Sequence, residues 1–288
     1  MSNNYFKKIF SSSSNPYFIA EIGINHNGSI NLAKKMIKEA KKNGADCVKF
    51  QKFYANRIIS KYAPKANYQK KDKKLKKKTQ LQIIKSYELN IDQIKELKKF
   101  CKLINIDFLC TPFDIESINE LVKIGVKALK ISSDNINNIP FLKEAAKTRL
   151  PILLSTGMSN MKEVEQAVKI FKKKGNPLLV MQCTSNYPSN IANSNISVLK
   201  KFKKKFNCYV GLSDHTESLL PSIIAISLGA SAIEKHFTIS RKLPGIDQKA
   251  SIEPKELKTL TTMSKQAKIA LGKEEKKLTN EELNSVKT

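Results

Sequence analysis

The sequence is poor in several residue types, and each shortage narrows the range of functions. Its 288 residues include no tryptophan, three histidines and five cysteines. An odd number of cysteines without CxxC spacing indicates neither a disulfide framework nor a zinc motif. The cysteines concerned are Cys47, Cys101, Cys110, Cys183 and Cys208. We therefore expect small, buried thiols in a reduced cytoplasmic protein.

Long apolar runs are also missing. No stretch approaches the ~18 uninterrupted apolar residues of a membrane helix, which argues against a membrane protein. The start of the chain, MSNNYFKKIFSSSSNPY, has two lysines but lacks the apolar segment of a signal peptide. We interpret residues 1–17 as a loose leader.

Negative charge is scarce, because 25 acidic residues face 52 basic ones and the net charge is +27. Such a surface can bind nucleic acid, but proteins that read nucleic acid favour arginine. Only three basic residues are arginine (Arg57, Arg149 and Arg241), and the lysines are spread over many amphipathic segments. A solvated lysine surface is therefore favoured over a nucleic-acid interface. The positive field would still attract anionic substrates such as phosphates.

Short β-branched runs alternate with longer amphipathic runs along most of the chain. The strand candidates are residues 18–24, 47–53, 107–113, 128–133, 151–156, 178–185, 209–214 and 232–238. Helical spacing marks residues 31–45, 91–105, 117–125, 161–175, 220–230 and 254–272. This alternation predicts a single-domain (β/α)8 TIM barrel over residues 18–275, close to the usual size of about 250 residues. A doubly wound sheet is disfavoured, because INHNGS follows the first strand in place of a glycine-rich fingerprint.

Two segments depart from this alternation. Residues 54–90 separate the second strand from its helix and hold a polar, lysine-rich run. A loop of this length in a compact domain is either functional or disordered, and we interpret it as an active-site lid or excursion. Residues 276–288 are interpreted as a C-terminal tail.

Polar side chains gather where the predicted strands end. In a (β/α)8 barrel the carboxyl ends of the strands form the active site. A set of cations and hydroxyl donors at these ends suits a ligand that carries both phosphate and carboxylate. Its members are Lys49, Thr111, Lys130, Ser133, Ser155, Ser185 and Ser213. Burying such a cup costs free energy unless it binds a ligand, so we predict a substrate site here.

The three histidines also lie at predicted strand ends on this face of the barrel. His215 and His236 follow adjacent strands, and their imidazole nitrogens suit a divalent metal. His26 follows the first strand, near the same mouth. Glu21 stands on that first strand, which would close the barrel beside the last one. Its carboxylate could stabilise a cationic carbon or accept a proton.

Nine motifs, in order along the chain, resemble the sialic acid synthase family. They are AEIGINHNGS, ADCVKFQKF, FLCTPFD, LKISS, LLSTGMS, QCTSNYP, GLSDHT, AIEKHFT and PGIDQKASIEP. The resemblance extends from about Phe18 to Glu282 and covers all eight predicted strands. Enzymes of this family condense phosphoenolpyruvate with an N-acetylated amino sugar, which yields a nonulosonic acid and phosphate.

The resemblance implies roles for the residues at the strand ends. Phosphoenolpyruvate would bind the cations and hydroxyls of the cup, and Gln51, Tyr187 and Asp247 would contact the sugar. After the methylene carbon of phosphoenolpyruvate attacks the sugar aldehyde, Glu21 would stabilise the oxocarbenium and help water to add. The tetrahedral product would then lose phosphate.

The resemblance also implies a cofactor and a partner. His215 and His236 would hold a divalent metal, Mn²⁺ or Mg²⁺, acting as a Lewis acid on the aldehyde. His26 would shape the loop or the sugar pocket and would not bind the metal. The family pattern also allows a homodimer.

Three departures from the family pattern concern the sugar site. Asn135 stands where members commonly carry an acidic residue, with Asp134 just before it, and we keep Asn135 as a candidate substrate-binding residue. Gln248 replaces a frequent histidine. Members usually continue into a C-terminal antifreeze-like domain that supplies an arginine across a dimer, and this sequence stops where the linker to that domain would begin.

Two other functions stay open. A Schiff-base aldolase or lyase could use Lys130 or Lys235, since desolvated barrel lysines perform this chemistry. The second is a catalytically impaired barrel that only binds a sugar acid or a partner protein. Retention of both histidines and the lysines favours the synthase.

Overall fold

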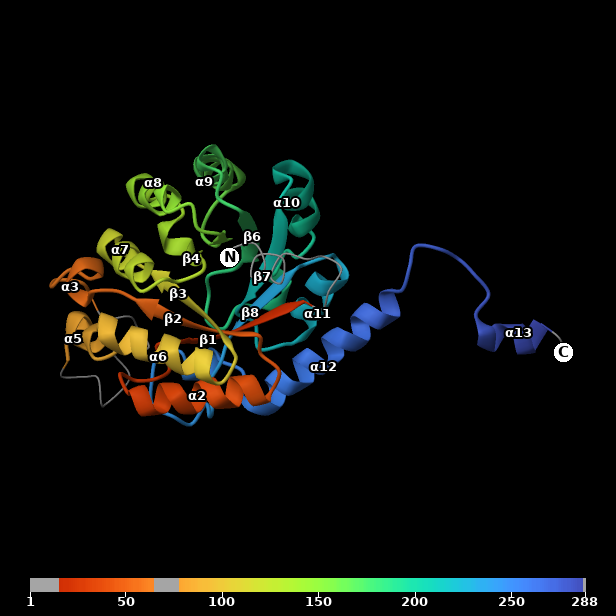
Figure 1. Cartoon of the computed structure of the whole chain (residues 1–288), viewed down its shortest axis with the longest axis horizontal. Helices are drawn as coiled ribbons and strands as arrows, with labels where there is room; N and C mark the ends of the chain where they lie inside the picture. Colours follow the sequence, from red (N-terminus) through yellow and green to blue (C-terminus); the bar gives the residue numbers. More distant parts are fainter. Residues whose placement is uncertain (1–15, 65–77, 287–288) are drawn as a thin grey trace.

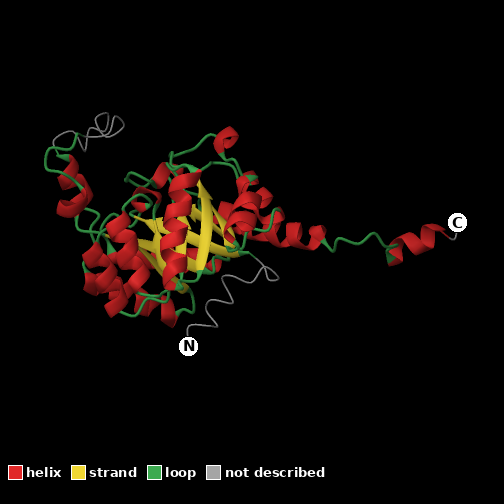
Figure 2. Ribbon diagram, turned by 90° about the horizontal axis from the view of Figure 1, so that it is seen from above, coloured by secondary structure: helices red, strands yellow, loops and turns green. Residues whose placement is uncertain are grey.

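The computed structural model describes residues 16–64 and 78–286 of the chain, and these fold as a barrel of parallel strands surrounded by helices (Figures 1 and 2). All eight predicted strands are present. They are β1 Tyr17–Gly23, β2 Cys47–Lys52, β3 Asp107–Pro112, β4 Leu129–Ile131, β5 Ile152–Ser155, β6 Leu178–Cys183, β7 Tyr209–Asp214 and β8 Ala232–His236. The predicted TIM barrel is confirmed.

The strands follow the order β3-β2-β1-β8-β7-β6-β5-β4, so the first and last strands of the chain are neighbours. Glu21 of β1 pairs in register with Lys49 of β2 on one side and with His236 of β8 on the other. The ends of the sheet, β3 and β4, lie against each other and complete the ring. This pairing brings residues from the two ends of the chain to one mouth.

The helices form the outer layer of the barrel, as Figure 2 shows. Their bounds are α2 Ile30–Lys42, α3 Ala55–Ile58, α5 Gln80–Lys85, α6 Ile91–Leu103, α7 Ile115–Lys123, α8 Ile139–Lys147, α9 Met161–Lys174, α10 Val198–Phe206, α11 Leu220–Ser227, α12 Pro254–Leu271 and α13 Asn280–Val286. Local chemistry sets the ends of these helices. In α9, Asn160 and Glu163 form a capping box, and Gly175 ends the helix with φ 75°. None of the described helices is long and apolar enough to cross a bilayer.

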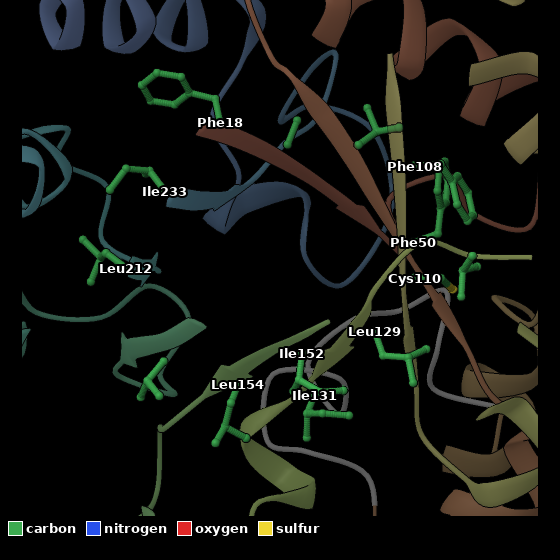
Figure 3. Close-up of a cluster of buried hydrophobic side chains, with 14 of the residues drawn as sticks. Phe18, Phe50, Phe108, Cys110, Leu129, Ile131, Ile152, Leu154, Leu212 and Ile233 are labelled. Atoms are coloured by element: carbon green, nitrogen blue, oxygen red, sulfur yellow. The ribbon is translucent and has the colours of Figure 1, made fainter. Parts of the chain in front are cut away.

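The two faces of each strand enter different cores, because side chains alternate across a strand with period two. Phe18, Phe50, Phe108, Ile131 and Ile233 point outwards and pack under the helices, in the cluster drawn in Figure 3. A separate apolar layer fills the floor of the barrel. It consists of Tyr17, Ile19, Cys47, Leu109, Ala128, Leu153, Leu179, Met181 and Ala232. The next inward positions along the strands, above this floor, are the polar ones.

The segments predicted outside the regular alternation are partly described. Within residues 54–90, α3 and α5 pack beside the barrel through an apolar cluster that includes Ile24, Phe53, Ile83 and Tyr87. Residues 65–77 of that insertion and residues 1–15 of the predicted leader lie outside the described residues. In the predicted tail, residues 276–288, helix α13 extends away from the barrel (Figure 1).

Candidate active site at the carboxyl ends of the strands

A cavity of about 350 Å³ opens at the carboxyl ends of the strands. It contains thirteen of the fourteen residues that the sequence singled out. Its lining is Glu21, Lys49, Gln51, Thr111, Phe113, Lys130, Ser132, Ser133, Asp134, Ser155, Met158, Cys183, Ser185, Tyr187, Ser213, His215, Glu234, His236 and Asp247. The polar cup predicted from strand ends therefore exists as one contiguous space.

Four buried charges of alternating sign form the base of this cavity. The Nζ of Lys49 lies 2.9 Å from Oε2 of Glu21 and 3.8 Å from Oε2 of Glu234. The Nζ of Lys130 lies 3.4 Å from Oε1 of Glu234. All four side chains are at least 95% buried, so solvent screens them little. The arrangement Glu21, Lys49, Glu234, Lys130 balances its own charge.

The two glutamates of this set have opposite protonation tendencies. Burial raises the pKa of Glu21, and the neighbouring Lys49 only partly opposes this effect. Burial also acts to raise the pKa of Glu234, but Lys130 and Lys49 outweigh it and hold that pKa at about 2. Glu234 is therefore a permanent anion, whereas Glu21 can exchange a proton. Divergent pKa values in one site are a mark of acid–base function.

Hydroxyl groups complete the cation sites. Lys49 donates to Oγ1 of Thr111 at 3.0 Å, and Lys130 donates to Oγ of Ser155 at 2.6 Å. Ser213 donates to Glu234 at 3.0 Å, and Oγ of Ser133 accepts from the backbone N–H of Gly157 at 2.9 Å. Ammonium and hydroxyl donors on several strands thus converge, as recognition of a phosphate and a carboxylate requires.

Gly157 has no room for a side chain beside these hydroxyls. A Cβ atom there would lie 2.2 Å from Oγ of Ser185 and 2.8 Å from Oγ of Ser133. We expect Gly157→Ala to displace both hydroxyls and to raise KM for the anionic substrate about tenfold, since misplaced contacts lose binding. Steady-state kinetics would check this. Gly125→Ala is the control outside the cavity, because no other group lies within 4 Å of its Cβ position. Its φ of 72° should cost some stability, but KM should be unchanged.

His215 and His236 face each other, with ring centroids 5.5 Å apart. Nδ1 of His215 donates to the carbonyl oxygen of Thr184 at 2.8 Å. Its Nε2 lies 3.4 Å from Oγ of Ser213, a hydroxyl that donates to Glu234. Nδ1 of His236 is buried without a hydrogen-bond partner, and Asp247 Oδ2 lies 3.8 Å from it. Burial lowers the pKa of His236, which keeps that imidazole neutral.

These two imidazoles fit an open divalent-metal site. Unprotonated imidazole nitrogens are suitable ligands, and catalytic sites keep further positions for water or substrate. Burial acts to lower the pKa of His215, but Cys183 and the carbonyl of Thr184 outweigh it and raise that pKa, so metal binding there would compete with a proton. Within residues 16–64 and 78–286, no group of three or more histidine, cysteine or acidic side chains is arranged to hold a metal. A metal at the pair would therefore leave most of its coordination positions open.

The three side chains predicted to contact a sugar, Gln51, Tyr187 and Asp247, all line the cavity. The ring of Tyr187 lies 4.2 Å from that of His215 between centroids and meets His236 edge-on. Gln51 donates to Glu21 at 3.0 Å. Burial raises the pKa of Asp247 to about 6. An aromatic face, an amide and a carboxyl group are suited to a polyhydroxylated ligand.

The structure places Asn135 outside the cavity, unlike the other candidates. The turn at Ser133–Asn135 buries this side chain, whose Oδ1 accepts from Asn138 at 3.2 Å. Asp134 lines the cavity instead. Gln248 has a structural position, because it donates to the carbonyl of Asn25 at 2.9 Å and ties the loop after β8 to the loop after β1.

Two lysines that could form a Schiff base differ in position. Lys130 lines the cavity, and burial lowers its pKa. Lys235 is outside it: its Nζ pairs with Asp214 at 2.9 Å and donates to the carbonyl of Thr216 at 2.8 Å. Alternation along β8 explains this, since Glu234 and His236 point inwards and Lys235 points outwards.

His26 is 1% exposed and does not line the cavity. Its Nδ1 accepts from the backbone N–H of Gly28 at 3.0 Å, and its ring packs near Phe50. It therefore holds the turn after β1, in agreement with a loop-shaping role.

Burial of His26 makes the stability of the protein depend on pH. Burial lowers the pKa of His26 from 6.5 to about 4, so the folded state keeps the ring neutral. The stabilisation is complete above pH 6.5 and is lost as the pH falls towards 4, up to about 3 kcal/mol. We expect His26→Asn to remove this component of the pH dependence. Urea unfolding of both proteins at pH 7 and pH 4.5 would measure it, and equal losses in both would contradict the assignment.

Six residues of the cavity lining were absent from the sequence-based set, and two of them, Glu234 and Cys183, contact members of that set. Glu234 lies between the two lysines, and Cys183 accepts from Oγ of Ser133 at 3.5 Å. Period-two alternation was the available signal, since Glu234 is two residues before His236 and Cys183 is two before Ser185. Listing strand ends by residue type alone did not separate inward from outward side chains.

Known proteins resemble this chain over most of its length. A profile of the NeuB family matches residues 36–276. The N,N'-diacetyllegionaminic acid synthase of Campylobacter jejuni is 44% identical over 93% of this chain and 81% of that protein. The N,N'-diacetyllegionaminic acid synthase of Legionella pneumophila is 40% identical over 93% and 76%, respectively. The crystal structure of the sialic acid synthetase of Leptospira borgpetersenii in complex with citrate matches with a TM-score of 0.84 at 35% identity, over 96% of this chain and 91% of that one. The chain therefore belongs to the NeuB family.

Proposed function

We propose that this protein condenses phosphoenolpyruvate with an N-acetylated amino sugar to give a nonulosonic acid and phosphate. The observation that carries the proposal is the cavity base, where two buried ammonium groups and several hydroxyl donors converge beside a carboxyl group and a pair of imidazoles. Phosphoenolpyruvate has two anionic groups, and the site offers two cations, Lys49 and Lys130. The names of the NeuB-family relatives support the same reaction class.

The reaction forms one carbon–carbon bond and replaces the carbon–oxygen bond to the phosphate by one to an oxygen from water, which becomes the keto oxygen of the product after losing its protons. The methylene carbon of phosphoenolpyruvate attacks the sugar aldehyde, whose oxygen becomes a hydroxyl group after gaining a proton. Water adds to the resulting oxocarbenium carbon, and phosphate leaves with the bridging oxygen. Glu21 lies at the cavity base, where its carboxylate stabilises the cationic carbon and accepts a proton from the added water.

The remaining residues bind and orient the reactants. Lys49 with Thr111 and Lys130 with Ser155 hold the two anionic groups, which fixes the direction of the methylene carbon. Tyr187 and Asp247 hold the acceptor at the cavity mouth. A divalent metal, Mn²⁺ or Mg²⁺, bound by His215 and His236 would supply Lewis-acid polarisation of the aldehyde.

The acceptor that we propose carries two N-acetyl groups. Support comes from the relatives at 44% and 40% identity, which are both N,N'-diacetyllegionaminic acid synthases. Phosphoenolpyruvate contains no nitrogen, so both acetamido groups of such a product come from the sugar. A single-acetamido sugar would leave part of the acceptor contacts unused and would react more slowly.

Phosphate release tests this proposal directly. Purified protein is incubated with Mn²⁺, phosphoenolpyruvate and, in turn, a 2,4-diacetamido hexose or N-acetylmannosamine. We expect release that depends on the sugar, is faster with the diacetamido sugar and stops on chelation. Absence of release with every amino sugar would refute the synthase.

A Schiff-base enzyme is the second candidate, because Lys130 lines the cavity and burial lowers its pKa. Borohydride with substrate would then trap a covalent adduct on Lys130, and a chelator would leave activity unchanged. Lack of an adduct, together with inhibition by the chelator, favours the synthase.

A further inference from the structure

We propose that Glu234 is a positioning residue, whose carboxylate holds the ammonium groups of Lys49 and Lys130 at the separation that phosphoenolpyruvate requires. This inference rests on the proposed function and deepens it. Glu234 lies within the AIEKHFT motif, but the sequence-based set of site residues did not include it.

The carboxylate of Glu234 is shared between the two cations. Oε1 lies 3.4 Å from Nζ of Lys130 and accepts from Oγ of Ser213 at 3.0 Å, while Oε2 lies 3.8 Å from Nζ of Lys49. Glu234 is 4% exposed. This one buried side chain therefore contacts both lysines and Ser213 of β7. The position of β8 thus helps to fix the ammonium groups that come from β2 and β4.

The two lysines depend on Glu234 to different degrees. Lys49 has a second anionic partner, Glu21 at 2.9 Å. Glu234 is the only ion-pair partner of Lys130 in the part of the chain that the structure describes. Two ammonium groups buried in one cavity repel each other, and an uncompensated buried charge is costly. Without Glu234, Lys130 would move away from Lys49.

Direct substrate binding by Glu234 is disfavoured by its depth and charge. Glu234 of β8 is in register with Ile19 of β1, which belongs to the apolar floor. His236 is in register with Glu21, in the next layer of inward side chains towards the mouth. A permanent anion at this depth repels the phosphate and carboxylate of phosphoenolpyruvate. Glu234 therefore favours phosphoenolpyruvate binding only through the positions that it gives to the two lysines.

The test compares a ligand with two anionic groups and a ligand with one. Glu234→Gln keeps the shape and removes the charge. Titration calorimetry without sugar should show phosphoenolpyruvate binding at least about tenfold weaker, because its two groups no longer meet two preset cations. Inorganic phosphate, which needs one cation site, should bind within about threefold of wild type, since the cavity has gained positive charge. The kcat of phosphate release should fall about 100-fold.

Two further variants separate positioning from folding. Glu234→Asp retains the charge on a shorter side chain and should recover at least tenfold of the kcat lost in Glu234→Gln. Glu120→Gln removes the partner of another buried lysine, Lys52 at 3.3 Å, outside the cavity. It should cost stability in thermal unfolding but leave both affinities and kcat unchanged.

Several outcomes would overturn the positioning role. The first is that Glu234→Gln weakens the binding of phosphoenolpyruvate and of phosphate equally. The second is that it weakens the binding of neither, and the third is a wild-type kcat in folded Glu234→Asp. If Glu234→Gln fails to fold, the ratio of the two affinities in Glu234→Asp decides, with a wild-type ratio counting against the role. The proposed function fails separately, when wild-type protein releases no phosphate with any amino sugar.

Discussion

Replacing His236 by alanine is expected to abolish condensation while leaving the barrel folded. The ring is buried beside His215, and its Nδ1 has no hydrogen-bond partner, so its loss strands no other polar group. Loss of a proposed metal ligand would remove several kcal/mol of transition-state stabilisation, a decrease in kcat of about 1,000-fold or more. Truncation of the side chain should cost about 2 kcal/mol of stability.

Phosphate-release kinetics and thermal unfolding with and without Mn²⁺ would measure both effects. Added Mn²⁺ should raise the melting temperature of the wild type and not that of His236→Ala, because a ligand stabilises only the state that binds it. His26→Asn is the matched control, since His26 lies near the same mouth but outside the cavity. Survival of activity in His236→Ala would show that the metal assignment is wrong.

Replacing Glu21 by glutamine should have the second large effect. Glutamine can keep the hydrogen bond to Gln51, so the cavity shape should persist. Without a carboxylate to stabilise the cationic carbon or accept a proton, kcat should fall about 100- to 1,000-fold. The KM for phosphoenolpyruvate should change little, because Lys49 keeps Thr111 and Glu234 as partners.

The pH dependence of the same variant gives an independent check. Burial raises the pKa of Glu21, so the active carboxylate is lost at a pH above the ordinary glutamate value of about 4.3. Wild-type kcat should therefore decline on the acid side earlier than an exposed glutamate would allow. This acid limb should be absent from the residual activity of Glu21→Gln. An unchanged limb would assign it to another group, such as Asp247.

The architecture was predictable from local patterns, with errors at element ends. Eight β-branched runs were recognisable because a buried parallel strand needs apolar side chains on both faces. The fourth strand was predicted over residues 128–133 but spans Leu129–Ile131, because Ser133 begins a tight turn. The leader was predicted to end at residue 17, whereas β1 begins at Tyr17. Helix α8, of nine residues, was not among the amphipathic runs identified.

The sequence by itself determined the barrel and the chemical composition of its mouth. Strand runs and the residues that end them are local features, and a TIM barrel gathers all strand ends at one face. The family resemblance assigned Glu21, His215 and His236 their expected roles from motifs alone.

Only the tertiary structure decided which neighbouring side chains face the cavity. Asp134 and not Asn135 lines it, Glu234 and not Lys235 points inwards, and His26 packs behind it. These outcomes depend on the turn after β4 and on the register of β1 against β2 and β8. A buried charge keeps its ionised form only where partners from other strands surround it, and residues far apart in sequence supply those partners.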